Sequence, residues 1–308
     1  MRRCVIWGAG EEYERILNQV KYEELKGNLE CVAVLSKTAS QFAREKDGYR
    51  LIGKEDLRDI AFDYLIVAAE RSYGEIKREA VSLGISEQRI ISSRVLKVPG
   101  FDFKSYASLR ENPITILSDD CWGGYVYHEL DLPFASPLIN IYWPSESFYE
   151  FMKDPFFYLE QPLRMEREGD PRKNLFPIGW LGDDNRRVEL HFVHESDFQK
   201  AEGQWNRRKA RINRERVFVK FGFDGTDPRR EAYLAAFDQV PYNKMCTYSG
   251  ETDVKDVLYI KRFEWDWYHL QRIEIVGFKD WFRQPQNFFK VVDVFKLLNG
   301  ERDYVRER

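Results

Sequence analysis

The 308-residue chain contains only four cysteines and four histidines, and this scarcity limits its chemistry. The cysteines, Cys4, Cys31, Cys121 and Cys246, stand far apart and form no C-x-x-C pair. A zinc ribbon needs paired cysteines and a disulfide framework needs many cysteines in a short chain, so neither is indicated. Reduced thiols are typical of the cytoplasm, and we expect a cytoplasmic protein.

Long apolar runs and a strong net charge are also lacking. No uncharged apolar stretch reaches about 18 residues, so no membrane span is predicted. The opening apolar run, MRRCVIWGAG, ends at Glu11 and Glu12 and is too short for a signal peptide. The net charge of -3 gives no general attraction to nucleic acid or to an anionic membrane, so no nucleic-acid partner is expected.

Aromatic side chains are abundant, with 17 Tyr, 22 Phe and 8 Trp. Such residues fill cores and also offer flat surfaces to sugars and bases, so their excess is compatible with carbohydrate binding, although an aromatic-rich core is the simpler interpretation. The length predicts two domains. A polar, proline-bearing junction lies between about Gly100 and Pro113, and we divide the chain into residues 1–104 and 105–308.

The first domain is predicted to be a small Rossmann-like, doubly wound α/β domain. Strand-like runs such as CVAVL and DYLIVAA are continuously apolar, as in parallel strands covered on both faces, and helical patterns lie between them. Gly8 and Gly10 resemble the start of a dinucleotide-binding turn and are the candidate cofactor-binding residues. Position 13 is Tyr, however, and the second strand ends in Ser36 and Lys37 where an acidic residue would hold a ribose, so NAD is not expected.

Residues 54–96 also carry a resemblance. Their order of strand, helix with Tyr and Ile, Leu-Gly-Ile and strand is similar to that of small Rossmann-like domains in bacterial surface-polysaccharide enzymes. In those enzymes the domain precedes sugar acyltransferase or methyltransferase modules.

The second domain is predicted to be α/β with a mixed sheet. Strands are expected at residues 114–118, 138–143, 176–181, 187–195, 217–224, 245–249 and 257–263. Helices are expected at residues 147–160, 196–213, 229–240 and 288–298.

The stretch from Ile114 to Pro144 holds the densest group of reactive side chains. ITIL is predicted to be a strand, SDDCWGG a tight turn at its carboxyl end, and YVYHEL the start of a helix. Open α/β sheets place their sites at such strand ends. The candidate residues are Asp119, Asp120, Cys121, Trp122, Gly123, Gly124 and, four positions later, His128.

One interpretation of this turn is a metal-dependent sugar transferase. Asp119 and Asp120 would hold Mg²⁺ or Mn²⁺, and Gly123 and Gly124 would admit the diphosphate of a nucleotide sugar. The metal is required because bare carboxylates repel a diphosphate. His128 or His191 would act as the base.

A second interpretation makes Cys121 the nucleophile of a hydrolase or acyl transferase. In a helix His128 would lie roughly 10 Å along the axis from Cys121, too far for a local thiol and base pair. His191 or His194 could still reach Cys121 across the fold. In a third interpretation the turn is structural, with an aspartate capping the helix, Trp122 packing and the glycines permitting a tight crossing.

Two further segments supply candidate residues. In RVELHFVHE, alternation places Glu189 and His191 on one face as a candidate acid and base pair, although a solvated face is the simpler interpretation, and it places His194 on the other. The helix 196–213 is predicted to begin with a capping box of Ser196 and Gln199 and to carry a basic stripe, which is either a solvated face or a phosphate contact. Its candidate ligand contacts are Trp205, Arg207, Arg208, Lys209, Arg211 and Asn213.

Three stretches together resemble a known family. They are SDDCWGGYVYHELDLPFASPLINIYW, Trp205 with residues 207–213, and Phe237 to Lys244. They are similar to the domain-of-unknown-function family numbered 1919, labelled exopolysaccharide biosynthesis, over about residues 113–299. The resemblance implies a bacterial protein that works near capsule or exopolysaccharide assembly, with other polysaccharide-biosynthesis proteins as its expected partners.

We therefore expect a surface-polysaccharide biosynthesis protein whose second domain binds a nucleotide-activated or phosphorylated sugar, with glycosyl transfer as the leading reaction. The alternatives are thiol chemistry at Cys121 and a non-catalytic assembly module.

Overall fold

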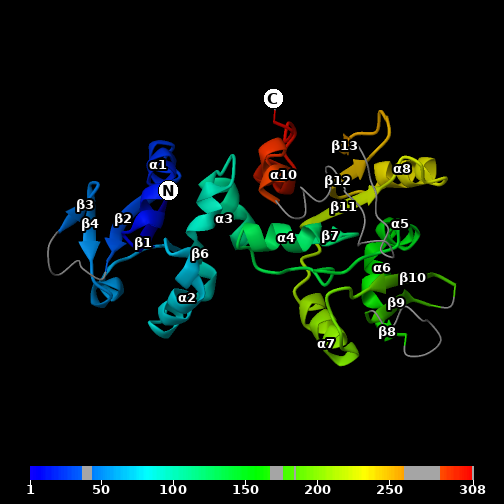
Figure 1. Ribbon diagram of the computed structural model, residues 1–308, viewed down its shortest axis with the longest axis horizontal. Helices are drawn as coiled ribbons and strands as arrows, with labels where there is room; N and C mark the ends of the chain where they lie inside the picture. Colours follow the sequence, from blue (N-terminus) through cyan, green and yellow to red (C-terminus); the bar gives the residue numbers. More distant parts are fainter. Residues whose placement is uncertain (37–43, 167–175, 184, 260–284, 307–308) are drawn as a thin grey trace, which may run out of the picture. The chain divides into compact units, whose positions relative to one another are not determined.

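The computed structural model describes residues 1–36, 44–166, 176–183, 185–259 and 285–306, which form two compact units (Figure 1). The first unit comprises Met1–Glu111, Glu129–Pro133 and Asp293–Asn299. The second comprises Asn112–His128, Phe134–Val292 and Gly300–Arg308. The predicted division after residue 104 falls inside helix α3 (Phe103–Glu111), which belongs to the first unit.

The first unit is built on one sheet with the strand order β3-β4-β2-β1-β5-β6. All neighbouring pairs are parallel except β3 with β4. Without β3, and numbered along the chain, the order is 3-2-1-4-5, the Rossmann arrangement that was predicted. The strands are β1 (Arg2–Trp7), β2 (Leu29–Leu35), β3 (Glu45–Lys46), β4 (Tyr49–Ile52), β5 (Tyr64–Val67) and β6 (Ile90–Ser92).

The helices of this unit follow the predicted periodicity. In α1 (Glu11–Leu25) the apolar positions Tyr13, Ile16 and Val20 are buried, because they recur on one face of the helix. Helix α2 (Tyr73–Ser82) follows β5 by way of a short 3₁₀ turn, and β6 continues into a 3₁₀ helix at Ser93–Lys97.

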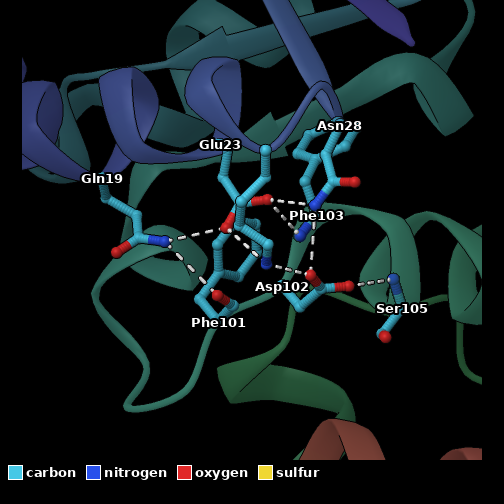
Figure 2. A network of polar contacts seen from close by, with 8 residues as sticks. Gln19, Glu23, Asn28, Phe101, Asp102, Phe103 and Ser105 are labelled. Atoms are coloured by element: carbon cyan, nitrogen blue, oxygen red, sulfur yellow. Dashed lines mark hydrogen bonds and ion pairs between the residues drawn. The ribbon is translucent and has the colours of Figure 1, made fainter.

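A buried carboxylate near the end of α1 joins the helix to the start of α3 (Figure 2). Glu23 is fully buried and accepts hydrogen bonds from Gln19 Nε2 at 3.1 Å, Asn28 Nδ2 at 2.8 Å and the backbone N of Phe103 at 3.0 Å. Asp102 caps α3, since its Oδ1 accepts from Ser105 N at 2.8 Å. The network satisfies the buried charge and explains why α3 stays with the first unit.

The second unit contains two sheets. Four parallel strands run in the order β13-β12-β11-β7, and three antiparallel strands run in the order β10-β9-β8. The α/β class is therefore confirmed, with the strands divided between a parallel and an antiparallel sheet. The strands are β7 (Thr115–Ser118), β8 (Arg164–Met165), β9 (Ile178–Gly182), β10 (Arg187–His191), β11 (Val217–Phe223), β12 (Asn243–Tyr248) and β13 (Val257–Tyr259).

The helices of the second unit differ from prediction at two breaks. The predicted helix 147–160 is two helices, α5 (Ser145–Lys153) and α6 (Pro155–Glu160), because Pro155 has no backbone N–H to continue α5 and Asp154 caps α6 instead. The last predicted helix is also divided, into α10 (Pro285–Val291) and α11 (Val294–Asn299). The other helices are α4 (Trp122–Glu129), α7 (Phe198–Lys209) and α8 (Arg230–Gln239).

Three strand predictions also change. The strand predicted at 187–195 ends at His191, so His194 lies after β10 and not on it. Residues 138–143 form no strand, and only Tyr142 makes an isolated bridge, to His191. The strand predicted at 257–263 is present as β13, and its last four residues lie outside the described residues.

The core of the second unit lies on one face of β11. Val219, Phe221 and Phe223 pack there with aromatic side chains from α5, α7 and α8, including Phe148, Trp205 and Tyr233. Every residue of β11 is buried, so the strand is covered on both faces. Among the helices of the described residues, none combines the length and apolarity needed to cross a membrane.

Candidate functional site

The turn between β7 and α4 has the predicted form of a strand, a tight turn and a helix. β7 ends at Ser118, α4 begins at Trp122, and Cys121 is the last residue of the turn. Cys121 O accepts from Tyr125 N at 3.1 Å, so the thiol lies at the amino end of α4. The turn is at the carboxyl end of a parallel strand, where α/β proteins commonly bind ligands.

Asp119 and Asp120 are buried around the ammonium group of Lys220, which extends from β11. Lys220 Nζ lies 2.9 Å from Asp119 Oδ1 and 2.5 Å from Asp120 Oδ2. The second oxygen of Asp119 accepts from Gly222 N at 3.0 Å. The second oxygen of Asp120 accepts from Ser118 Oγ at 3.0 Å and from Trp122 N at 2.9 Å. The group of Asp119, Asp120 and Lys220, here called the buried charge cluster, is thus fully hydrogen-bonded.

This arrangement does not fit the divalent cation that the sequence suggested for Asp119 and Asp120. Each of their four carboxylate oxygens already accepts a hydrogen bond, and the Lys220 ammonium supplies the positive charge between them. Within the described residues no three His, Cys, Asp or Glu side chains are grouped as metal ligands. A metal would have to displace Lys220, so we derive no step through one.

The buried charge cluster carries two carboxylates for one ammonium, and this imbalance affects Asp119. Burial, together with the repulsion from Asp120, outweighs the attraction of Lys220 and raises the pKa of Asp119 to about 7. The two carboxylates raise the pKa of Lys220 above its ordinary value, despite its burial, so the lysine stays charged. One carboxylate of the cluster therefore takes up a proton near neutral pH.

The Asp119 carboxyl makes a testable contribution to stability. Because its folded-state pKa is raised, the folded protein holds the proton more tightly than the unfolded chain does. The resulting stabilisation is present at low pH and is lost as pH rises through about 7. Compared with Asp119→Asn, wild type should lose up to about 4 kcal/mol of unfolding free energy between pH 4 and 8, measured by urea denaturation. Parallel pH profiles for the two proteins would contradict this prediction.

Cys121 meets a histidine from a distant part of the chain. Its Sγ lies 3.2 Å from His194 Nε2, within contact distance for a thiol and a base. Burial and the nearby Asp120 raise the pKa of the Cys121 thiol to about 12, so the thiol is protonated at neutral pH. His128 is exposed on α4, seven positions from Cys121. The structure thus pairs Cys121 with His194, one of the two partners that the sequence left open.

The other residues of the turn have clear packing roles. Trp122 is buried against Phe218 and Phe288, with ring centroids 5.7 and 5.5 Å away. A side chain at Gly123 would meet Ile116 at 3.0 Å, and one at Gly124 would meet Asn140 Oδ1 at 2.8 Å. The capping by Asp120, the packing of Trp122 and the close approach at both glycines match the structural interpretation of the turn. The side chain of Cys121, in contrast, is half-buried.

Glu189 and His191 are in contact, as their shared strand face predicted. The His191 Nε2 atom touches Glu189 Oε1, and both residues are buried. The imidazole lies beside the rings of Tyr142 and Phe176, at 5.6 and 5.1 Å between centroids. The pair is therefore an internal one, and the alternative of a solvated strand face does not hold.

The capping residue of the basic helix α7 lies one position later than predicted. Asp197, and not Ser196, caps it, since Asp197 Oδ1 accepts from Lys200 N at 2.7 Å. Trp205 is only 1% exposed and packs on Phe192, so it belongs to the core and cannot contact a ligand from solvent. Asn213 also forms an internal hydrogen bond, because its backbone N donates to Thr115 Oγ1 at 2.8 Å.

The helix α7 ends at Lys209, four residues before the predicted end at Asn213. The basic side chains of residues 207–214 divide into two groups. Arg208 donates to Ile139 O at 3.0 Å and Lys209 to Gln161 O at 3.3 Å, so both tie the helix to neighbouring segments. Arg207 and Arg211 are exposed, as the stripe predicted. Arg214 pairs with Glu160 at 2.8 Å. Of the predicted contacts in this segment, Arg207 and Arg211 have exposed side chains that can reach a ligand.

Gly8 and Gly10 lie where the Rossmann arrangement places a nucleotide. Gly8 has φ +119°, and a side chain there would meet Ala68 O at 2.7 Å, so this glycine lets β1 end close to β5. Gly10 precedes α1, whose first turn carries Glu11, Glu12 and Glu14. Glu12 pairs with Lys97 at 3.1 Å. Carboxylates at this helix end disfavour a pyrophosphate, and NAD binding is not proposed.

Lys220 is the one member of the site that sequence reasoning missed. The signal was a lysine in the middle of the continuous apolar run VFVKFGF, since a lysine is almost never fully buried unless it is paired. Its two partners are about a hundred residues away in sequence, which is why no local pattern named them.

The fold and site together define a two-unit α/β protein with a Rossmann-like first unit and a cysteine–histidine pair at a strand end of the second. Residues 92–299 match the family model described as Domain of unknown function (DUF1919), and the chain belongs to that family. Residues 1–91 match the model C2185-like, N-terminal. An uncharacterized protein of Haemophilus influenzae is 31% identical over 158 residues, which is 51% of this chain and 72% of that protein.

Proposed function

We propose that the protein is a thiol-dependent acyl transferase or hydrolase with Cys121 as its nucleophile and His194 as its general base. The observation that carries this proposal is the contact of 3.2 Å between Cys121 Sγ and His194 Nε2. The two residues come from the turn after β7 and from the segment after β10, and only the tertiary fold brings them together.

The reaction begins with a protonated thiol, because burial raises the pKa of Cys121. His194 Nε2 removes the thiol proton as Sγ attacks the acyl carbonyl carbon, and the carbonyl electron pair moves to oxygen. When the tetrahedral intermediate collapses, the imidazolium returns the proton to the leaving group and a thioester remains on Cys121. Water or an acceptor hydroxyl then attacks the thioester, with His194 again taking and returning the proton.

The amino end of α4 suits the negative charge that develops on the carbonyl oxygen. Gly123 and Gly124 are in its first turn, and their backbone N–H groups bond to no described residue. Trp122 N, in contrast, is already occupied by Asp120. The positive end of a helix dipole and unpaired N–H groups are the features used to stabilise an oxyanion.

An activated ester tests the proposal directly. Treated with p-nitrophenyl acetate, the full-length protein should release a burst of nitrophenol and carry one acetyl group on Cys121, located by peptide mass mapping. Cys121→Ala should abolish the burst, and His194→Asn should slow it by about 100-fold or more. His128→Asn is the matched control and should react as wild type does. Acylation that is absent, or that persists in Cys121→Ala, would refute the proposal.

We also keep the binding of a phosphorylated or nucleotide-activated sugar as a second candidate function. The favouring observation is that Arg207, in the last turn of α7, and Arg211, just after the helix ends, are both exposed, and neither pairs with a carboxylate among the described residues. Arginine binds phosphate through two parallel hydrogen bonds, which suits such a ligand.

The test is a thermal-shift titration with a panel of nucleotide sugars and sugar phosphates, with and without Mn²⁺. Binding should raise the melting temperature, and the shift should disappear in an Arg207→Gln, Arg211→Gln double variant. A Lys200→Gln variant, on an exposed position of the same helix, serves as the control. If no ligand in the panel stabilises the wild-type protein, the proposed binding of a phosphorylated or nucleotide-activated sugar is refuted.

A further inference from the structure

The buried charge cluster and the Cys121 thiol belong to the same turn. We propose that Lys220 is a positioning residue for Cys121, which clamps the turn through Asp119 and Asp120 and so presents the thiol to His194. This inference rests on the proposed thiol chemistry and identifies the residue that supports it from the interior.

Asp120 fixes the chain on both sides of Cys121. Its Oδ1 accepts from the hydroxyl of Ser118, three residues before the thiol, and from the backbone N of Trp122, one residue after it. Its Oδ2 contacts Lys220 Nζ at 2.5 Å. Since Lys220 belongs to β11, the ion pair attaches the turn to the neighbouring strand.

Asp119 adds a second attachment to the same strand. One of its oxygens contacts Lys220 at 2.9 Å, and the other accepts from Gly222 N at 3.0 Å. Its backbone O accepts from Trp143 N at 2.8 Å. Asp119, Asp120 and Trp122 are thus each held in the interior, and the half-buried Cys121 is the residue of the turn whose side chain meets a base.

Lys220 also balances the charge that the thiol encounters. The charged and titratable groups that act on Cys121 are Asp119 and Asp120 from the turn, Lys220 from β11 and Tyr125 from α4, and His194 is in contact with its thiol. The two carboxylates oppose a thiolate and the ammonium favours one. Without Lys220, a thiolate forming at Cys121 would lie beside two uncompensated carboxylates.

A lysine that served stability alone would have no effect on the ionisation of the thiol in a folded protein. The measurement is therefore the rate of Cys121 alkylation by iodoacetamide between pH 6 and 9, read by peptide mass mapping of the full-length chain. The variants are Lys220→Met and Asp119→Asn, with Lys200→Met as a matched exposed control and circular dichroism as the check of folding.

We expect Lys220→Met to alkylate about tenfold more slowly than wild type at pH 8, which corresponds to a rise of about one unit in the thiol pKa. Asp119→Asn should react several-fold faster because one negative charge is removed, and Lys200→Met should match wild type. Rates that agree within about twofold across all variants would overturn the proposal. If Lys220→Met does not fold, the Asp119→Asn variant is the test. An alkylation rate of Cys121 in Asp119→Asn equal to that of wild type would overturn the proposal.

The outcome is separable from that of the proposed function. Failure of the thiol chemistry appears in the wild-type protein as a missing acetyl group on Cys121. Failure of the positioning role appears as normal acetylation of wild type together with alkylation rates that do not respond to Lys220→Met or Asp119→Asn.

Discussion

Lys220→Met is expected to lower the free energy of unfolding at pH 8 by about 3 to 5 kcal/mol, because it leaves two buried carboxylates without their cation. Lys220 is 1% exposed and contacts both aspartates. The loss should be smaller at pH 5, where Asp119, whose pKa burial raises to about 7, accepts a proton. Urea denaturation at the two pH values measures the difference.

Two comparisons test whether the loss of stability in Lys220→Met comes from the buried charge cluster. Lys200→Met removes an exposed lysine that pairs with Glu195 at 2.9 Å, and it should cost no more than about 1 kcal/mol. A triple variant, Lys220→Met with Asp119→Asn and Asp120→Asn, removes all three charges and should be more stable than Lys220→Met alone. A triple variant as unstable as the single one would mean that packing, not charge, explains the loss.

Trp205→Ala is expected to destabilise the protein by about 3 to 5 kcal/mol through the cavity that it leaves. The indole is 1% exposed and packs in the core of the second unit beside Phe192. The sequence suggested a ligand contact for this residue, in which case the substitution would weaken binding and leave stability unchanged. Chemical denaturation therefore separates the two roles.

Arg207→Gln, two residues further along α7, is the matched control for Trp205→Ala. The Arg207 side chain is exposed, so its substitution should change the unfolding free energy by no more than about 0.5 kcal/mol. A Trp205→Ala variant that unfolds at the wild-type urea concentration would contradict the core assignment.

Local patterns were sufficient for most of the secondary structure. The continuous apolar runs that became β2, β5 and β11 were read correctly because strands covered on both faces contain few polar residues. The prediction for residues 138–143 was wrong, since a short apolar run is equally compatible with a buried loop. Pro155 is a residue that commonly interrupts a helix, but the apolar periodicity on both sides of it led to the prediction of a single helix.

The candidate site was predicted from its position at the end of a strand, and not from the reactivity of its side chains. The sequence placed SDDCWGG at the end of a strand and therefore at the edge of a sheet where ligands bind, and β7 and α4 flank it as predicted. It also excluded a local pairing of Cys121 with His128, since helical rise alone separates them by roughly 10 Å. These conclusions needed only distances along the chain.

The sequence by itself determined the α/β class, the Rossmann-like first unit and the location of the turn that carries Cys121, because each follows from the spacing of apolar and polar residues. Tertiary structure alone decided which distant residues contact that turn. Lys220 and His194 reach it from about a hundred and about seventy residues away. The first lies between the two aspartates where a metal was expected, and the second contacts the cysteine, and no local pattern encodes contacts at that separation.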